Sequence, residues 1–288
     1  MTSGCATPRF WCRAAKPTRL APRRPRRTRP KPPKPHRKGW IRPMTRPQAQ
    51  TQMLFRDDPY MTEADAEVVA HTPEGGVVLD ASLFYPTGGG QPGDSGRITW
   101  DAGTMGVATA VKGEEAQIVL VPGDAAVLPP VGTRVRQEID WDRRFGHMRV
   151  HTGLHLLSVV LPYPVTGGSI GPAKGRLDFD MAEAPEDRDA IEAALNALVD
   201  RDLPVGEDWI TEAELDANPG LVKTMSVQPP RGAGRVRLVR IGEGDDLVDL
   251  QPCGGTHVAR TAEIGALRLG KIEKKGRQNR RVSIHLDD

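Results

Sequence analysis

Residues 149–157, RVHTGLHLL, place His151 and His155 four residues apart. The valine and leucines of this stretch recur near helical spacing. On an α-helix residues i and i+4 lie on one face, so both imidazoles can point at one centre. An HxxxH pair alone is weak support for a metal site. In the zinc-protease motif the residue after the first histidine is a glutamate base, and Thr152 at that position excludes that class.

A second pair of candidate ligands lies about a hundred residues later, in residues 251–258, QPCGGTHV. Cys253 and His257 flank Gly-Gly-Thr, which is unsuited to a helix but forms a tight turn that can direct both side chains inward. A cysteine without partners is often a small buried hydrophobe. With a histidine in the same turn and an HxxxH pair elsewhere, a four-coordinate Zn²⁺ site is the better interpretation. We therefore predict one zinc ion per chain, bound by His151, His155, Cys253 and His257.

The sequence around these motifs predicts an α+β fold. Residues 144–161 and 185–202 have helical periodicity, and the later segments alternate apolar and polar residues as antiparallel strands do. Residues 144–288 are therefore expected to form an α+β domain with an antiparallel sheet and the zinc site. Residues 53–143 contain short strands separated by turns and a Gly-rich loop, which predicts a small antiparallel β-barrel domain.

The charge is divided unevenly along the chain. Residues 1–56 carry 16 Lys and Arg and no acidic residue, whereas the remainder carries 24 Lys and Arg against 37 Asp and Glu, a net charge of −13. Residues 1–52, rich in proline and arginine, are predicted to be a disordered tail. A start codon assigned too far upstream, a nucleic-acid-binding arm and a targeting peptide are the alternatives for this tail. Apolar runs are too short for a membrane helix, and Cys253 is the only cysteine of the body, which fits a reducing compartment.

HxxxH followed by CGGTH resembles the editing domain shared by alanyl-tRNA and threonyl-tRNA synthetases and their freestanding relatives. FYPTGGGQPGDSG (residues 84–96) narrows the resemblance to the alanyl branch, and DLQPCGGTHV, EIG and KIEKKGRQNRR occur in the family's order. The resemblance covers residues 53–286 and indicates a freestanding alanyl-tRNA editing protein of the AlaX type. It implies a deacylase, and we expect this enzyme to be cytoplasmic, ATP-independent and monomeric. Its substrate would be alanine tRNA mischarged with serine or glycine.

The chemistry of such an enzyme can be argued from the residues. An aminoacyl ester is already activated, so its hydrolysis needs a positioned water and stabilisation of the developing negative charge. A zinc-bound water is the expected catalytic group, and no side-chain base is assigned. Three firm ligands are expected, with the fourth residue or a water exchanging as substrate arrives. If all four bind tightly, the zinc is structural or only orients the substrate.

Substrate-binding residues are predicted in three segments. In the family a segment after the HxxxH helix reads the amino-acid side chain, and here it is VTGGSIG (residues 165–171), taken as a loop. Thr166 is the first candidate and Ser169 the second, unless both only form a turn. The loop Gly88, Gly89, Gly90 and Gln91 would approach the tRNA end or pack against the editing site. A basic hairpin would contact tRNA phosphates, unless its cations only solvate a strand edge; its residues are Lys271, Lys274, Lys275, Arg277, Arg280 and Arg281, extended by Arg143, Arg144 and Arg149.

Two other functions remain open from the sequence. One is a zinc-stabilised tRNA- or RNA-binding module without hydrolytic activity. The other is a zinc hydrolase acting on a small ester. Deacylation of mischarged alanine tRNA separates the enzyme from the binding module, and discrimination between charged tRNA and a free seryl ester separates it from the small-ester hydrolase.

Overall fold

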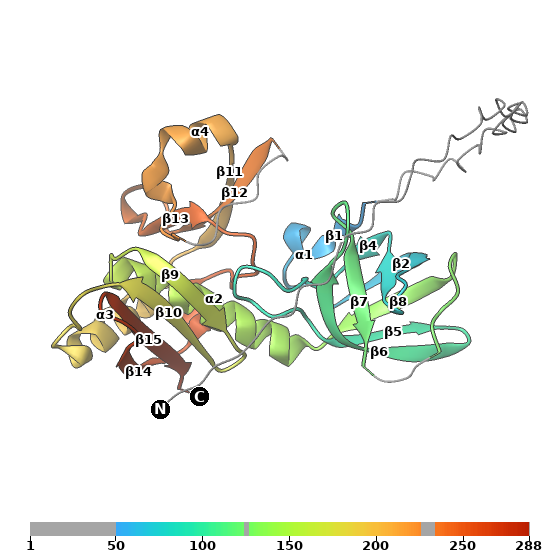
Figure 1. The fold of residues 1–288 in the computed structure, drawn as a ribbon, viewed down its shortest axis with the longest axis horizontal. Helices are drawn as coiled ribbons and strands as arrows, with labels where there is room; N and C mark the ends of the chain where they lie inside the picture. The colour runs from blue at the N-terminus through green and yellow to red at the C-terminus, as the bar shows by residue number, and fades with distance from the viewer. Residues whose placement is uncertain (1–49, 124–126, 226–233, 288) are drawn as a thin grey trace, which may run out of the picture. The chain divides into compact units, whose positions relative to one another are not determined.

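The computed structural model describes residues 50–123, 127–225 and 234–287, which form an α+β fold within one compact unit (Figure 1). Residues 1–49 of the predicted tail lie outside this range. Residues 51 and 52 were assigned to the tail but belong to the fold, because the Thr51 hydroxyl donates to the Leu79 carbonyl at 2.9 Å and Gln52 begins a strand. No helix in the described ranges is both long and apolar enough to cross a membrane.

A closed antiparallel barrel follows, as predicted, with strand order β2-β3-β7-β6-β5-β8. Alternate residues of each strand point into the barrel and form its core. In β6 these are Met105 and Val107 and, after a bulge that shifts the register, Ala110. Outside the barrel, β1 (Gln52–Met53) pairs in parallel with β4 (Ala81–Ser82), and α1 (Leu54–Asp57) follows β1 directly. The barrel strands are β2 (Glu63–His71), β3 (Val77–Leu79), β5 (Gly96–Trp100), β6 (Gly103–Lys112), β7 (Ile118–Pro122) and β8 (Arg134–Ile139).

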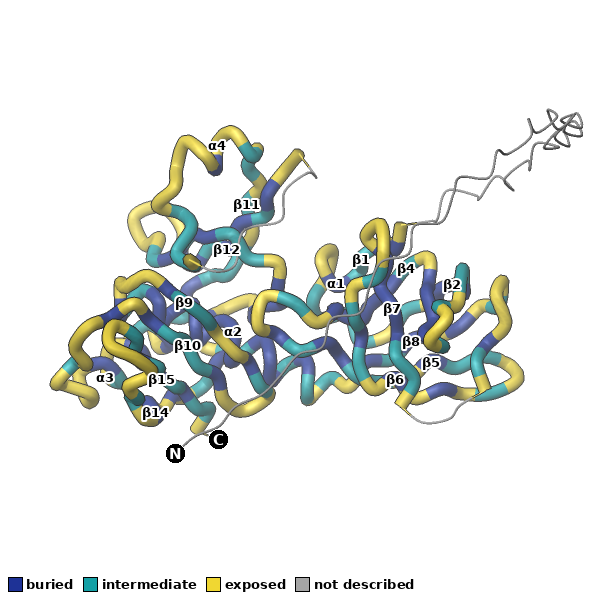
Figure 2. The backbone as a smooth tube through the Cα atoms, viewed as in Figure 1, coloured by how far each residue is buried: buried dark blue, intermediate teal, exposed yellow. Residues whose placement is uncertain are grey.

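The helix α2 (Trp141–Val160) carries both histidines of the first motif. The Asp140 side chain caps it by accepting from the Arg143 amide, so the helix begins three residues before the predicted Arg144. Trp141 packs against both the barrel core and the core of the remaining fold. Most residues from the second turn onward are buried, as Figure 2 shows. The predicted domain boundary at residue 143 thus falls inside α2 and stays a prediction.

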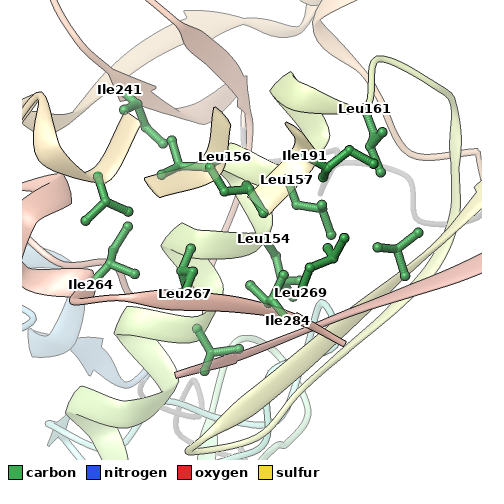
Figure 3. Close-up of a cluster of buried hydrophobic side chains, with 14 of the residues drawn as sticks. Leu154, Leu156, Leu157, Leu161, Ile191, Ile241, Ile264, Leu267, Leu269 and Ile284 are labelled. Carbon is green, nitrogen blue, oxygen red and sulfur yellow. The ribbon is translucent and has the colours of Figure 1, made fainter. Parts of the chain in front are cut away.

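The rest of the fold surrounds α2. A four-stranded antiparallel sheet, in the order β14-β15-β10-β9, contacts α2 on three of its strands and α3 on β14. Figure 3 shows the shared core, where Leu154 and Leu157 of α2 lie among Ile191 of α3 and side chains of the sheet. These elements are β9 (Val165–Ile170), β10 (Lys174–Asp180), α3 (Arg188–Asp200), β14 (Leu267–Lys274) and β15 (Asn279–Leu286).

A smaller antiparallel sheet has the order β11-β12-β13 and leads into the second motif. Helix α4 contacts β11 and β12, and a capping box between Thr211 and Glu214 fixes where it begins. The elements are β11 (Val205–Thr211), α4 (Glu212–Ala217), β12 (Arg235–Ile241) and β13 (Asp249–Pro252). Single 3₁₀ turns are η1 (Pro219–Leu221), η2 (Gly244–Asp246) and η3 (Thr261–Ile264).

Candidate metal centre

The structure brings His151, His155, Cys253 and His257 together. One face of α2 presents the first two, and the turn that follows β13 presents the others. Their candidate ligand atoms all lie within 4.8 Å of one another. The three histidines are buried, whereas Cys253 is half-buried. The cluster is therefore accessible to solvent mainly on the side of the cysteine.

Each imidazole in the cluster is oriented by a partner on its Nδ1 atom. Because these partners act as acceptors, each Nδ1 donates its proton to a partner, and each Nε2 is the ring atom left to bind a metal at the centre of the cluster. The three bonds run from His151 to Gln91 Oε1 (2.9 Å), from His155 to Asp249 Oδ2 (2.8 Å) and from His257 to Thr152 Oγ1 (3.2 Å).

Thr152 occupies the position where a zinc protease has its glutamate. Its hydroxyl donates to the Met148 carbonyl at 2.9 Å and must therefore accept from its other neighbours. Those neighbours are His257 Nδ1 and the Val258 amide, at 3.2 and 3.3 Å. Thr152 thus ties α2 to the CGGTH turn and fixes the tautomer of His257. Sequence analysis excluded a catalytic base here without finding this role.

The spacing of the cluster suits zinc. Cys253 Sγ lies 3.4 Å from His151 Nε2 and 3.3 Å from His257 Nε2. Zn–S and Zn–N bonds of about 2.3 and 2.0 Å at a tetrahedral angle separate sulfur and nitrogen by about 3.5 Å. A thiolate with three imidazoles is also a donor set that Zn²⁺ prefers. The residues present therefore fit a zinc ion.

Glycine in the CGGTH turn is required by a close approach to α2. A Cβ on Gly255 would lie 2.3 Å from His151 Cε1 and 2.7 Å from Gln91 Oε1. Any side chain at this position would push the imidazole or its partner aside. The turn therefore packs directly on the metal cluster because residue 255 has no side chain.

The electrostatics of the cluster favour a thiolate. Burial raises the pKa of Cys253, but the neighbouring His151 and His257 outweigh burial and lower the pKa well below its ordinary value. Burial and the charge of His151 lower the pKa of His257 to about 3. Burial also lowers the pKa of His155, but hydrogen bonds with Asp249 and Cys253 outweigh it and raise that pKa to about 9. The thiolate is the form of cysteine that binds a metal.

Asp249 is a functional residue that sequence analysis missed. Its side chain is fully buried, and it accepts from His155, from Gln251 Nε2 at 2.7 Å and from Lys223 Nζ at 2.5 Å. Burial raises its pKa, but His155 and Lys223 outweigh burial and lower the pKa to about 2. A buried, ionised carboxylate behind a ligating histidine is a common arrangement in zinc sites. One signal in the sequence could have indicated Asp249: it lies four residues before Cys253, so in an extended strand both side chains point to the same face.

The Gly-rich loop packs against the metal cluster, one of the two predicted alternatives. Gln91 is buried, accepts from His151 Nδ1 and the Thr256 amide, and donates to Thr256 Oγ1 at 2.8 Å. Gly90 adopts a φ of +85°, and its carbonyl accepts from the Ile170 amide at 2.9 Å. The contact of Gly88, Gly89, Gly90 and Gln91 with substrate stays a prediction.

The segment with Thr166 and Ser169 is a strand, not the loop expected after the HxxxH helix. It forms β9, which pairs with β10, and Gly168 of this strand also lies against the Gly-rich loop at Gly90. The Thr166 hydroxyl donates to the Asp178 carbonyl at 3.0 Å and accepts from Asn279 Nδ2 at 2.7 Å, whereas Ser169 is exposed. Their role in substrate recognition stays a prediction.

The basic segment is a hairpin of β14 and β15, and its cations have different surroundings. Lys271, Lys274, Lys275 and Arg277 are exposed. Two other candidates are held within the fold. Arg280 is buried and donates to backbone carbonyls, and Arg281 pairs with Asp178 at 2.8 Å. The four exposed residues are the ones positioned to reach a phosphate.

Two residues in the first turns of α2 are buried beside the barrel. Arg144, expected to extend the basic surface, is fully buried because its guanidinium pairs with Asp94 at 2.5 Å. His147 is also fully buried, and neither ring nitrogen has a hydrogen-bond partner within the described ranges. Burial, with the charge of Arg143 next, lowers the pKa of His147 to about 4; Asp94, Arg144 and His151 are the other charged groups that act on it.

Comparison with known proteins agrees with this geometry. The family described as the threonyl and alanyl tRNA synthetase second additional domain matches residues 236–283, and class II (A) tRNA synthetases match residues 45–143. The fold and cluster therefore define a protein related to the alanyl-tRNA synthetase editing region.

Similarity to whole proteins narrows this class. The alanyl-tRNA editing protein AlaX-M of Methanosarcina acetivorans is 33% identical over 83% of this chain and all of its own length. AlaX-L of Pyrococcus horikoshii is 32% identical, with 81% of this chain and 57% of its own length covered. An alanine–tRNA ligase of Pyrobaculum calidifontis is 34% identical over 78% of this chain but only 25% of its own length. The chain belongs to the AlaX family of alanyl-tRNA editing proteins.

Proposed function

We propose that this protein hydrolyses mischarged alanine tRNA, cleaving the ester between serine or glycine and the 3′ adenosine. The observation that carries the proposal is the buried cluster of three histidines and a cysteine, in which every histidine is oriented through Nδ1. Editing is needed because the selectivity of a synthetase's amino-acid pocket is limited. A pocket that holds alanine cannot exclude glycine by size and rejects serine only modestly, so a second hydrolytic site supplies selectivity.

Zinc is the metal that these four residues would hold. When bound, it would supply a positive charge that polarises the ester carbonyl and makes a water more acidic. The chain itself fixes the ligands. Gln91, Asp249 and Thr152 hold the imidazoles, and the half-buried Cys253 leaves its side of the cluster open to a substrate.

The tRNA would be held by charge at a distance from the cluster. The exposed cations Lys271, Lys274, Lys275 and Arg277 lie on one hairpin in a body that is otherwise acidic. Contacts with phosphates supply affinity that does not depend on sequence and that weakens with salt. Ser169 and Thr166 are the proposed readers of the amino-acid hydroxyl. A cytoplasmic location and a monomeric state remain predictions.

Deacylation of seryl-, glycyl- and alanyl-tRNA(Ala), with and without a chelator, tests the proposal. We expect loss of serine or glycine with alanine spared, and loss of activity on metal removal that zinc restores. If zinc and tRNA bind but no ester is cleaved, the protein is a binding module. Equal hydrolysis of a free seryl ester would instead indicate a small-ester hydrolase.

A further inference from the structure

Trp209 is an exposed aromatic side chain on the small sheet. It lies on β11, an edge strand, and 39% of its surface is accessible. Tryptophan side chains are usually largely buried, and exposed aromatic rings serve as platforms for unpaired bases in proteins that bind single-stranded nucleic acid. The position of Trp209 relative to the metal cluster therefore matters.

The strand register places Trp209 on the sheet face that carries Cys253. Trp209 pairs with Arg237 on β12, and the Cys253 amide donates to the Arg237 carbonyl at 3.3 Å, just beyond the end of β13. Residues opposite each other on neighbouring strands project from the same face. At about 4.8 Å per strand, the backbones of Trp209 and Cys253 are roughly 10 Å apart. Figure 1 shows the three strands side by side.

Hydrogen bonds join the side chains of this row and orient the indole. The Arg237 guanidinium donates to the carbonyls of Cys253 and Gly255, at 2.9 and 3.1 Å, and also pairs with Glu207. Glu207 Oε1 in turn accepts from Trp209 Nε1 at 3.3 Å. The ring is thus tied, through one carboxylate and one guanidinium, to the turn that carries two of the four cluster residues.

Positive charge gathers around the ring. Arg235 Cζ lies 5.9 Å from the centroid of the Trp209 ring, where a planar guanidinium can also stack on a base. Arg56 of α1 is near enough to Arg237 that burial, together with that positive charge, lowers the pKa of Arg56. Glu207 pairs with Arg237 and also acts on Arg56, and Glu214 acts on Arg235, so two acids face three arginines. An aromatic ring among arginines fits a nucleotide, since it offers a stacking surface to the base and positive charge to the phosphate.

We propose that Trp209 and Arg235 form the stacking subsite for the terminal adenine of the tRNA, with Arg237 near its phosphate. This inference rests on the proposed function, because it takes the ester at the 3′ end of the tRNA as the reacting group. A terminal adenosine stacked on Trp209 lies along the row that ends at Cys253, the one accessible residue of the cluster. The base and the ester then occupy opposite ends of one continuous strand face.

The test is equilibrium binding of uncharged tRNA(Ala) with and without its terminal adenosine, to the wild type and to Trp209→Ala and Trp209→Phe. Loss of one base–aromatic stack weakens binding by about 5- to 150-fold. We expect removal of the adenosine to weaken the wild type by a factor in this range, to weaken Trp209→Phe nearly as much, and to leave Trp209→Ala almost unaffected. Trp100→Ala, on barrel strand β5, is the matched control and should respond as the wild type does.

Steady-state kinetics supply a second readout. Trp209→Ala should raise KM for seryl-tRNA(Ala) by a similar factor, with zinc content unchanged. An equal loss of affinity on removing the adenosine in wild type and Trp209→Ala, with deacylation intact, overturns the subsite while the proposed function stands. If removing the adenosine weakens the wild type but not Trp209→Ala, and the protein cleaves no ester, the subsite is supported and the proposed hydrolase function is overturned.

Discussion

Replacing Gln91 by methionine tests whether the barrel loop holds the metal centre. Gln91 is 1% exposed, and its amide makes three hydrogen bonds, one with His151 and two with Thr256. Methionine fills a similar volume and makes none of them. Loss of the partner that orients a ligating histidine typically lowers metal affinity by about 10- to 100-fold, or roughly 1.4 to 2.7 kcal/mol. We therefore expect the zinc dissociation constant of Gln91→Met to rise by a factor in that range.

Gln91→Glu separates hydrogen bonding from packing. A carboxylate can still accept from His151 Nδ1 and the Thr256 amide, and the Thr256 hydroxyl can rotate to donate to it. The variant then resembles the observed pair of His155 and Asp249. We expect its zinc affinity to match or exceed that of the wild type.

Gln137→Met is the matched control for these variants. Gln137 of barrel strand β8 is also fully buried, accepts from the Leu83 amide at 3.0 Å and donates to the Ala81 carbonyl at 3.1 Å, and neither partner belongs to the metal cluster. Its loss should cost about 1 to 3 kcal/mol of unfolding free energy and leave zinc affinity unchanged. Competition with a chromophoric chelator measures the affinities. Equal zinc affinities for Gln91→Met and Gln137→Met would refute the role of the loop.

Three further predictions concern the cluster, the hairpin and the buried histidine. Cys253→Ala should lose zinc, measured by metal analysis, and deacylation with it; normal turnover by the metal-free variant would end the zinc hypothesis. Replacing Lys274, Lys275 and Arg277 together by alanine should raise KM for tRNA and reduce the slope of log KM against log salt by roughly 2 to 3; an unchanged constant would leave the hairpin as solvated surface. His147 is held neutral because its pKa is about 4 in the fold against about 6.5 unfolded, so its contribution to stability is complete above pH 6.5 and is lost as the pH falls toward 4. Chemical denaturation of the wild type and His147→Leu at several pH values measures this effect. As the pH falls over that range, the wild type should lose up to about 3 kcal/mol of unfolding free energy relative to the variant. A difference that does not change with pH would contradict the burial argument.

The four cluster residues could be predicted because their placement is local. Helical spacing aligns His151 with His155, and a glycine turn brings Cys253 next to His257. Their orienting partners could not be predicted in the same way. Gln91 and Asp249 come from segments 60 and 94 residues away from the histidines they contact, so their positions depend on how separate elements pack.

At two other places the local sequence pattern gave a wrong prediction, because contacts between distant segments determine the structure there. The glycine pair after Thr166 is typical of a turn, but pairing with β10 and the approach of the Gly-rich loop make it a strand. Arg144 lies in a charged run that suggests a surface, but the carboxylate of Asp94 makes a fully buried site for its guanidinium. The barrel itself was predictable, since alternation along each strand specifies which side faces the core.

The single helix that joins the barrel core to the metal cluster constrains how the gene can change length. Arg144 is locked into the barrel, and His151 begins the cluster two turns later on the same uninterrupted α2. Inserting or deleting one codon between them would rotate the histidines by about 100° around the helix axis relative to that anchor. Adding two whole turns would nearly restore the angle but would move the histidines roughly 10 Å along the axis. Insertions and deletions should therefore accumulate in the surface loops of descendants of this gene, while the six residues between the arginine and the histidine keep their number.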